Sequence, residues 1–61
     1  MAQKILVIDD DAHLRESLAE VLDLEGFSCL QAGNAKSGIA SAKKNLPDVV
    51  IMDIQLPDSS G

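Results

Sequence analysis

The sequence predicts an α/β fold in which a parallel sheet of three strands carries helices on its faces. Short apolar runs alternate along the chain with longer segments whose apolar residues recur at helical spacing. The segments between the runs are long enough for helical crossovers, which connect parallel strands in the right-handed sense. The order of elements is therefore β-α-β-α-β.

Length and composition exclude several classes of protein. The chain has 61 residues, so one domain is the upper limit, and its 46% hydrophobic residues suit a globular protein. No apolar run approaches the roughly 20 residues of a membrane span, and no signal-peptide pattern opens the chain, so we expect a soluble, cytoplasmic protein. The single Cys29 excludes an internal disulfide framework and a cysteine-based zinc site. A net charge of −5 and a single aromatic residue, Phe27, argue against a nucleic-acid surface.

The first strand is expected at residues 4–8, an apolar run that stops at three consecutive aspartates. Its short apolar pattern is typical of a strand buried on both faces. The period then changes to that of an amphipathic helix beginning at Ala12, with Asp11 as its N-cap and Gly26 at its end. We expect the apolar stripe of this helix to lie in the core; it comprises Leu14, Leu18, Val21 and Leu22.

A second, weaker strand is expected at residues 27–32, followed by a helix over 35–45 that Asn34 caps and Pro47 ends. Gly38 should weaken this helix by up to about 1 kcal/mol relative to alanine. The residues expected on its inner face are Ala35, Ile39, Ala42 and Leu46. Residues 49–52 form the most apolar run and predict a third, buried strand. The remaining residues, 54–61, have the composition of a loop.

Acidic residues follow two of the predicted strands. Asp9, Asp10 and Asp11 come after the first strand, and Asp53 comes after the third. The carboxyl ends of parallel strands meet at one edge of the sheet, which is where open α/β sheets bind ligands. Crowded carboxylates repel one another, and an all-oxygen set without His or Cys favours Mg²⁺, Mn²⁺ or Ca²⁺ over zinc. For Asp11, a helix cap is by itself a sufficient explanation.

These residues resemble those of the receiver domain of bacterial two-component response regulators. The resemblance rests on the run ILVIDDD at 5–11, on Arg15, and on PDVVIMD at 47–53. It continues in Leu56-Pro57 and in Gly61, eight residues after Asp53 (61 − 53 = 8). It implies a flavodoxin-like, doubly wound parallel sheet with strand order 2-1-3. Residues 1–61 would then form the N-terminal half of a receiver, ending before its third helix.

The resemblance also implies roles for individual residues. Asp53 would be the phosphoacceptor, taking a phosphoryl group from a sensor histidine kinase and thereby regulating an output domain, most simply a transcriptional one. Asp10 and Asp53 would bind Mg²⁺ directly, Asp9 would bind it through a water molecule, and Gln55 would offer its backbone carbonyl. Such a module accepts phosphate and is not an enzyme in its own right.

The family's site also uses a hydroxyl after the fourth strand and a lysine after the fifth, and this sequence contains neither segment. The lysines that are present should not substitute, because we expect them at strand starts or on helix surfaces: Lys4, Lys36, Lys43 and Lys44. The apolar run at 49–52 would lie at a sheet edge with no fourth strand beside it. We therefore expect this 61-residue segment to self-associate.

Two other functions fit parts of the pattern. Asp9-x-Asp11 has the spacing of a haloacid dehalogenase-type phosphatase, which also uses an aspartate nucleophile and Mg²⁺. That reading leaves Asp53 unexplained, and a helix begins where that family has a small residue followed by Thr or Val. A non-phosphorylated pseudo-receiver is the other alternative, although such variants usually lack one of the acidic residues. We expect His13 to face solvent and Cys29 to act as a small buried apolar residue.

Overall fold

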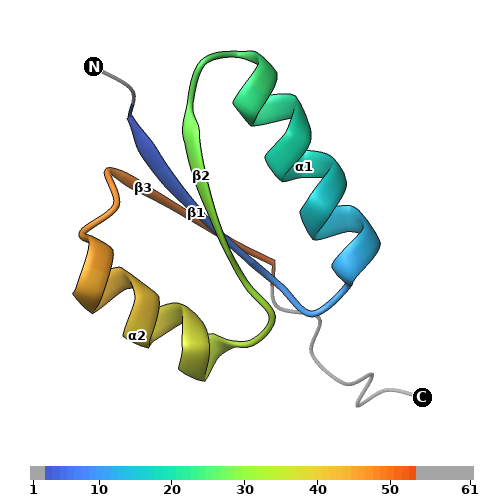
Figure 1. Cartoon of the computed structure of the whole chain (residues 1–61). Helices are drawn as coiled ribbons and strands as arrows, with labels where there is room; N and C mark the ends of the chain where they lie inside the picture. The colour runs from blue at the N-terminus through green and yellow to red at the C-terminus, as the bar shows by residue number, and fades with distance from the viewer. Residues whose placement is uncertain (1–2, 54–61) are drawn as a thin grey trace.

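The computed structural model describes residues 3–53, with the backbone alone at Asp53. It contains β1 (Lys4–Asp9), α1 (Ala12–Leu24), β2 (Ser28–Ala32), α2 (Ala35–Asn45) and β3 (Val49–Asp53). The strands form a parallel sheet in the order β2-β1-β3, with α1 and α2 on opposite faces (Figure 1). The predicted element order and strand order are confirmed. The expected loop at 54–61, including Gln55, Leu56-Pro57 and Gly61, lies outside the described residues.

The central strand β1 supplies most of the core. Its residues 5–9 are all buried, as the pattern of a doubly covered strand predicts. The register places Leu6 beside Leu30 and Val50, and the next residue along, Val7, beside Gln31 and Ile51. Because side chains alternate between faces, Leu6 points to one face of the sheet and Val7 to the other.

The helix ends follow the local signals in the sequence. The Asp11 carboxylate accepts hydrogen bonds from the backbone N–H groups of His13 and Leu14, and the Asn34 side chain accepts one from Ser37. After α1, Gly26 adopts a φ of 97°, a left-handed conformation that glycine tolerates. Helix α2 ends at Asn45, two residues before Pro47. The predicted caps and stops are therefore confirmed.

The expected inner face of α1 is wrong in part. Leu14, Leu18 and Val21 are exposed, Leu22 is half-buried, and the buried residue of this helix is Ala19. Helix α1 packs against β1 and β2, and the small Ala19 allows a close approach to them. The larger apolar side chains of α1 lie beside this contact, because the apolar face of the helix is wider than the surface that β1 and β2 cover.

The burial predicted for β3 is also wrong. The exposed fractions of Val49, Val50 and Met52 are 44%, 46% and 43%. In the described part of the chain β3 is an edge strand that pairs with β1 alone, and both helices lie mainly over β1 and β2. An apolar run therefore forms a strand here without being covered on its two faces.

The buried residue of α2 is Gly38 rather than the larger residues expected on its inner face. Ala42 is half-buried, whereas Ala35, Ile39 and Leu46 are exposed. A Cβ atom at position 38 would lie 2.7 Å from Ile8 Cγ1 and closer still to Ile8 Cδ1. Gly38 therefore allows α2 to approach β1. The close contact requires glycine at this position even though glycine has a low helix propensity.

Replacing Gly38 with alanine is expected to lower the free energy of unfolding by up to about 2 kcal/mol, because overpacking costs about 1–3 kcal/mol and the better helix propensity of alanine offsets about 1 kcal/mol of it. Urea denaturation followed by circular dichroism measures the change. The cost should fall in an Ile8→Val background, which removes the nearest atom. Lys36→Ala, an exposed change in the same helix, should stay within about 0.5 kcal/mol of the parent. A Gly38→Ala variant more stable than the parent would contradict the close approach.

Neither α1 nor α2, the helices within residues 3–53, is long and apolar enough to cross a membrane.

Candidate functional site

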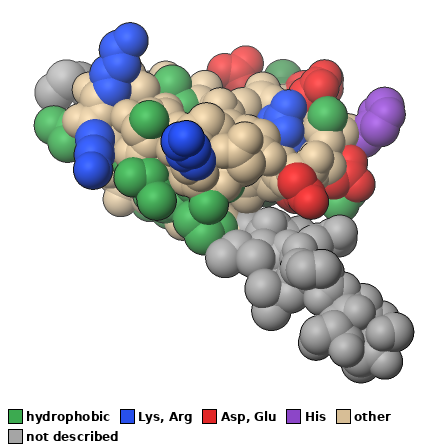
Figure 2. All heavy atoms as spheres, turned by 90° about the horizontal axis from the view of Figure 1, so that it is seen from below, with side chains coloured by type: hydrophobic (Ala, Val, Ile, Leu, Met, Phe, Trp, Pro, Cys, Tyr) green, Lys and Arg blue, Asp and Glu red, His purple; other side chains and the backbone are tan. Residues whose placement is uncertain are grey.

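The carboxyl edge of the sheet brings the backbones of three predicted site residues together: Asp9, Asp10 and Asp53. Strand β1 ends at Asp9 and β3 ends at Asp53, and these two residues are Cα partners in the parallel register. Asp10 and Asp11 follow directly in the connection from β1 to α1. Figure 2 shows acidic side chains and the histidine gathered toward one end of the visible face, with Lys and Arg mainly toward the other.

Asp9 is a buried carboxylate, with 7% of its surface exposed. Its Oδ1 accepts a hydrogen bond from the backbone N–H of Asp11 at 2.9 Å. Its backbone carbonyl accepts a second bond, at 2.8 Å, from Nη1 of Arg15. Burial of a charged carboxylate is costly unless hydrogen bonds or a cation compensate it. Within the described residues, the Asp11 N–H is the one group that donates to this carboxylate, and it satisfies only part of the acceptor capacity of Asp9.

Asp10 and Asp11 have different surroundings from Asp9. Asp11 Oδ1 accepts from the N–H groups of His13 and Leu14, at 3.0 and 3.2 Å, so this carboxylate is used at the N-terminus of α1. Asp10 is exposed, and no group within the described residues donates a hydrogen bond to its side chain. The three aspartates thus divide into a buried carboxylate, an exposed carboxylate and a helix cap.

The fit of a divalent cation rests on the donor types at this edge. Among the described side chains, no cluster of three or more His, Cys, Asp or Glu residues has the arrangement of a metal site. Asp9 and Asp10 are among these side chains, whereas Gln55 and the side chain of Asp53 lie outside the described residues. The oxygens of Asp9 and Asp10 suit Mg²⁺, and neither carboxylate is paired with Arg15, which binds the Asp9 carbonyl instead.

Most of the lysines lie away from this edge, as expected. The Lys4 backbone N–H donates to Asp48 Oδ2 at 2.8 Å, and its Nζ donates to the Asn45 carbonyl at 3.3 Å, which places Lys4 at the amino edge. Lys43 and Lys44 are exposed in the last turn of α2, at the same end. Lys36 is also exposed, as expected, but it lies in the first turn of α2, which follows the carboxyl end of β2, so it is not remote from this edge.

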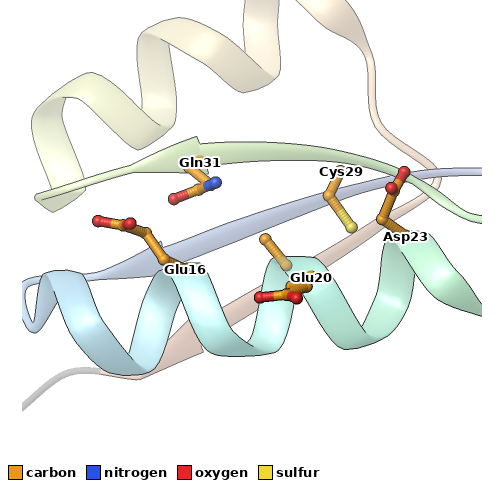
Figure 3. A pocket seen from close by; sticks show the side chains of 6 residues that line it. Glu16, Glu20, Asp23, Cys29 and Gln31 are labelled. Carbon is orange, nitrogen blue, oxygen red and sulfur yellow. The ribbon is translucent and has the colours of Figure 1, made fainter.

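An open hollow of about 410 Å³ lies between α1 and β2 (Figure 3). It is lined by Glu16, Ala19, Glu20, Asp23, Cys29 and Gln31. Cys29 is half-buried, and desolvation, with a smaller contribution from the negative charge of Asp23, raises the pKa of its thiol. A raised pKa disfavours the thiolate, which is the nucleophilic form of cysteine. His13 is exposed on α1, as expected.

Two residues at the carboxyl edge received no role from the sequence alone. Arg15 contributed only to the family resemblance, and Gln31 was one position in a predicted strand. In the structure, Arg15 Nε donates to Gln31 Oε1 at 3.2 Å while its Nη1 binds the Asp9 carbonyl. Arg15 follows Asp11 by four residues, which is a signal that it lies near the acidic connection. No sequence pattern signals its contact with Gln31 on β2.

Comparison with known proteins agrees with the family resemblance of the sequence. The family model described as the response regulator receiver domain matches residues 5–61. The chain is 44% identical over 57 residues to the probable transcriptional regulatory protein TcrX of Mycobacterium tuberculosis, covering 93% of this chain and 24% of that protein. It is 36% identical over 61 residues to the phosphate regulon transcriptional regulatory protein PhoB of Pseudomonas aeruginosa, and 41% identical to the DNA-binding response regulator MtrA of Mycobacterium leprae. Both matches cover 100% of this chain and 27% of the relative, so the chain spans about a quarter of the length of these relatives.

Proposed function

The chain belongs to the response regulator receiver domain family, and from this premise we propose that it accepts a phosphoryl group on Asp53 from a sensor histidine kinase. The observation that supports the proposal most directly is the backbone register. Asp53 ends β3 beside Asp9, which ends β1 and leads into an acidic connection. Trapping an acyl phosphate on Asp53 tests the proposal.

The reaction that we propose is a transfer between two nucleophiles. A carboxylate oxygen of Asp53 forms a bond to phosphorus while the P–N bond of the phosphohistidine breaks, and the kinase imidazole keeps the electron pair and takes up a proton. Because both the carboxylate and the phosphoryl group are negative, a nearby positive charge must offset their repulsion. Mg²⁺ held by the acidic residues at this edge would supply that charge.

In this proposal Asp10 and Asp53 bind the metal directly, Asp9 acts through a water molecule, and Gln55 contributes its backbone carbonyl. The surroundings of the two described carboxylates support these roles. Asp9 is held in a fixed position by the Asp11 N–H, and Asp10 is exposed without a competing hydrogen bond among the described residues. Asp11 is excluded from the set because its carboxylate caps α1.

We further propose that residues 1–61 correspond to the N-terminal half of a cytoplasmic receiver that regulates an output domain. The relatives support a transcriptional output, since their names describe transcriptional regulatory and DNA-binding proteins. The phosphatase alternative loses support, because the second aspartate of Asp9-x-Asp11 is used as a helix cap. A receiver accepts phosphate without turning over p-nitrophenyl phosphate, which a phosphatase of that type would hydrolyse.

Asp10→Ala is expected to weaken Mg²⁺ binding more than Asp11→Ala does, because Asp10 is exposed whereas the Asp11 carboxylate caps α1. Isothermal titration calorimetry with MgCl₂ gives the dissociation constants of the two variants. The Asp11 variant should instead lose about 1 kcal/mol of stability with its helix cap, which urea denaturation detects. The reverse order of Mg²⁺ affinities would show that Asp11, and not Asp10, faces the metal.

A further inference from the structure

The side chain of Arg15 connects three elements at the carboxyl edge. It extends from the first turns of α1, where Nη1 donates to the carbonyl of Asp9 on β1 and Nε donates to Gln31 Oε1 on β2. The distances are 2.8 and 3.2 Å. Nη1 also packs over Gly33, where an added Cβ would lie 3.4 Å away. Arg15 is half-buried as a residue, and its guanidinium donates to β1 and to β2.

Both acceptors of this guanidinium are neutral groups. An arginine so close to an acidic connection would ordinarily pair with a carboxylate, in a charge-assisted bidentate bond. Here the guanidinium N–H groups donate to the carbonyl of Asp9 and to the side-chain amide oxygen of Gln31. No hydrogen bond joins the guanidinium to the carboxylates of Asp9 or Asp10. Its positive charge still lies near these carboxylates and reduces their mutual repulsion.

The bond to the Asp9 carbonyl also fixes the backbone on which the proposed ligands stand. A carbonyl held in one direction fixes the plane of the peptide between Asp9 and Asp10. Two further hydrogen bonds hold this connection. The Asp11 N–H donates to Asp9 Oδ1 at 2.9 Å, and the main-chain N–H of Arg15 donates to the Asp11 carbonyl, also at 2.9 Å. The Arg15 side chain therefore contributes one of the bonds that hold the backbone of this connection, and the main-chain N–H of the same residue contributes another.

We propose that Arg15 is a positioning residue for the metal-binding connection, acting through the Asp9 carbonyl, and that Gln31 keeps its guanidinium away from the carboxylates. This inference rests on the proposed function, because it takes Asp9 and Asp10 as the residues that hold Mg²⁺. Groups that orient metal ligands typically change metal affinity by about 10–100-fold when they are removed.

The test compares Arg15→Ala, Arg15→Lys and Gln31→Leu by calorimetric titration with MgCl₂. Positioning predicts that each variant binds Mg²⁺ about tenfold more weakly. Lysine keeps the charge but lacks the planar fork that reaches two acceptors, and Gln31→Leu leaves Arg15 free to pair with a carboxylate. A purely electrostatic role predicts the opposite for Arg15→Ala, since removing a positive charge should strengthen cation binding. Lys43→Ala, an exposed change in the last turn of α2 at the amino edge, is the charge-matched control and should leave the affinity unchanged.

A second measurement needs no metal. Amide hydrogen exchange at Asp11 should be faster in Arg15→Lys than in the parent, because the bond from this N–H to Asp9 Oδ1 depends on the fixed connection. Circular dichroism identifies any variant that fails to fold, and Arg15→Lys and Gln31→Leu then decide the result in place of Arg15→Ala.

The outcomes separate this inference from the proposed function. Weaker Mg²⁺ binding in both Arg15→Lys and Gln31→Leu supports the positioning role. Unchanged or tighter binding in these variants, with weaker binding in Asp10→Ala, overturns the role of Arg15 and leaves the proposed metal site standing. Unchanged binding in Asp10→Ala as well would overturn the metal site and the inference together.

Discussion

Asp53→Asn is expected to abolish phosphoryl labelling of the protein by acetyl phosphate in the presence of Mg²⁺. The amide that replaces the carboxylate is not a nucleophile and forms no acyl phosphate. Borohydride reduction followed by mass spectrometry measures the adduct, because it traps an aspartyl phosphate at the residue that carried it. The expected effect is complete loss of the trapped species at position 53.

Asp48→Asn is the matched control for this experiment. Asp48 precedes the same strand at its amino edge, where Oδ2 accepts a hydrogen bond from the Lys4 N–H. An asparagine oxygen can accept the same bond, so labelling should stay at the parent level. Full labelling of Asp53→Asn would place the acceptor on another carboxylate and contradict the proposed site.

A polypeptide of these 61 residues is expected to self-associate through the outer edge of β3. Within the described residues this edge pairs with nothing, and Val49, Val50 and Met52 are all exposed. An apolar edge strand with free N–H and C=O groups, and without a charged side chain along its middle, favours pairing with another chain. Each copy carries a net charge of −5, so association should strengthen as salt screens the repulsion.

Sedimentation velocity and light scattering at micromolar concentration measure this association. Val50→Lys places a charge on the edge and should shift the population toward monomer while circular dichroism still reports helices. Ser28→Lys adds the same charge to β2, at the opposite edge of the sheet, and should leave association intact. A parent polypeptide that melts cooperatively as a monomer under these conditions would rule out the β3 edge as a contact.

The features that the sequence by itself determined are those that depend on neighbouring residues in the chain. Asp11 and Asn34 cap their helices, and Gly26 adopts the left-handed conformation after α1, because each acts on backbone groups only a few residues away. The apolar run of β1 also predicted its burial correctly, since a central parallel strand is covered on both faces. The family resemblance then supplied the strand order and the roles proposed for Asp53 and its neighbours.

Only the tertiary structure decided which apolar residues are covered and which polar groups meet. Ala19 and Gly38 are buried in place of larger neighbours because helices approach the sheet most closely where side chains are small. The apolar run of β3 stays exposed because its burial depends on what lies beside it, and periodicity carries no information about that neighbour. Arg15 meets Gln31, sixteen residues away, because α1 crosses over β2. Contacts of this kind depend on how elements pack in space, which local sequence patterns do not encode.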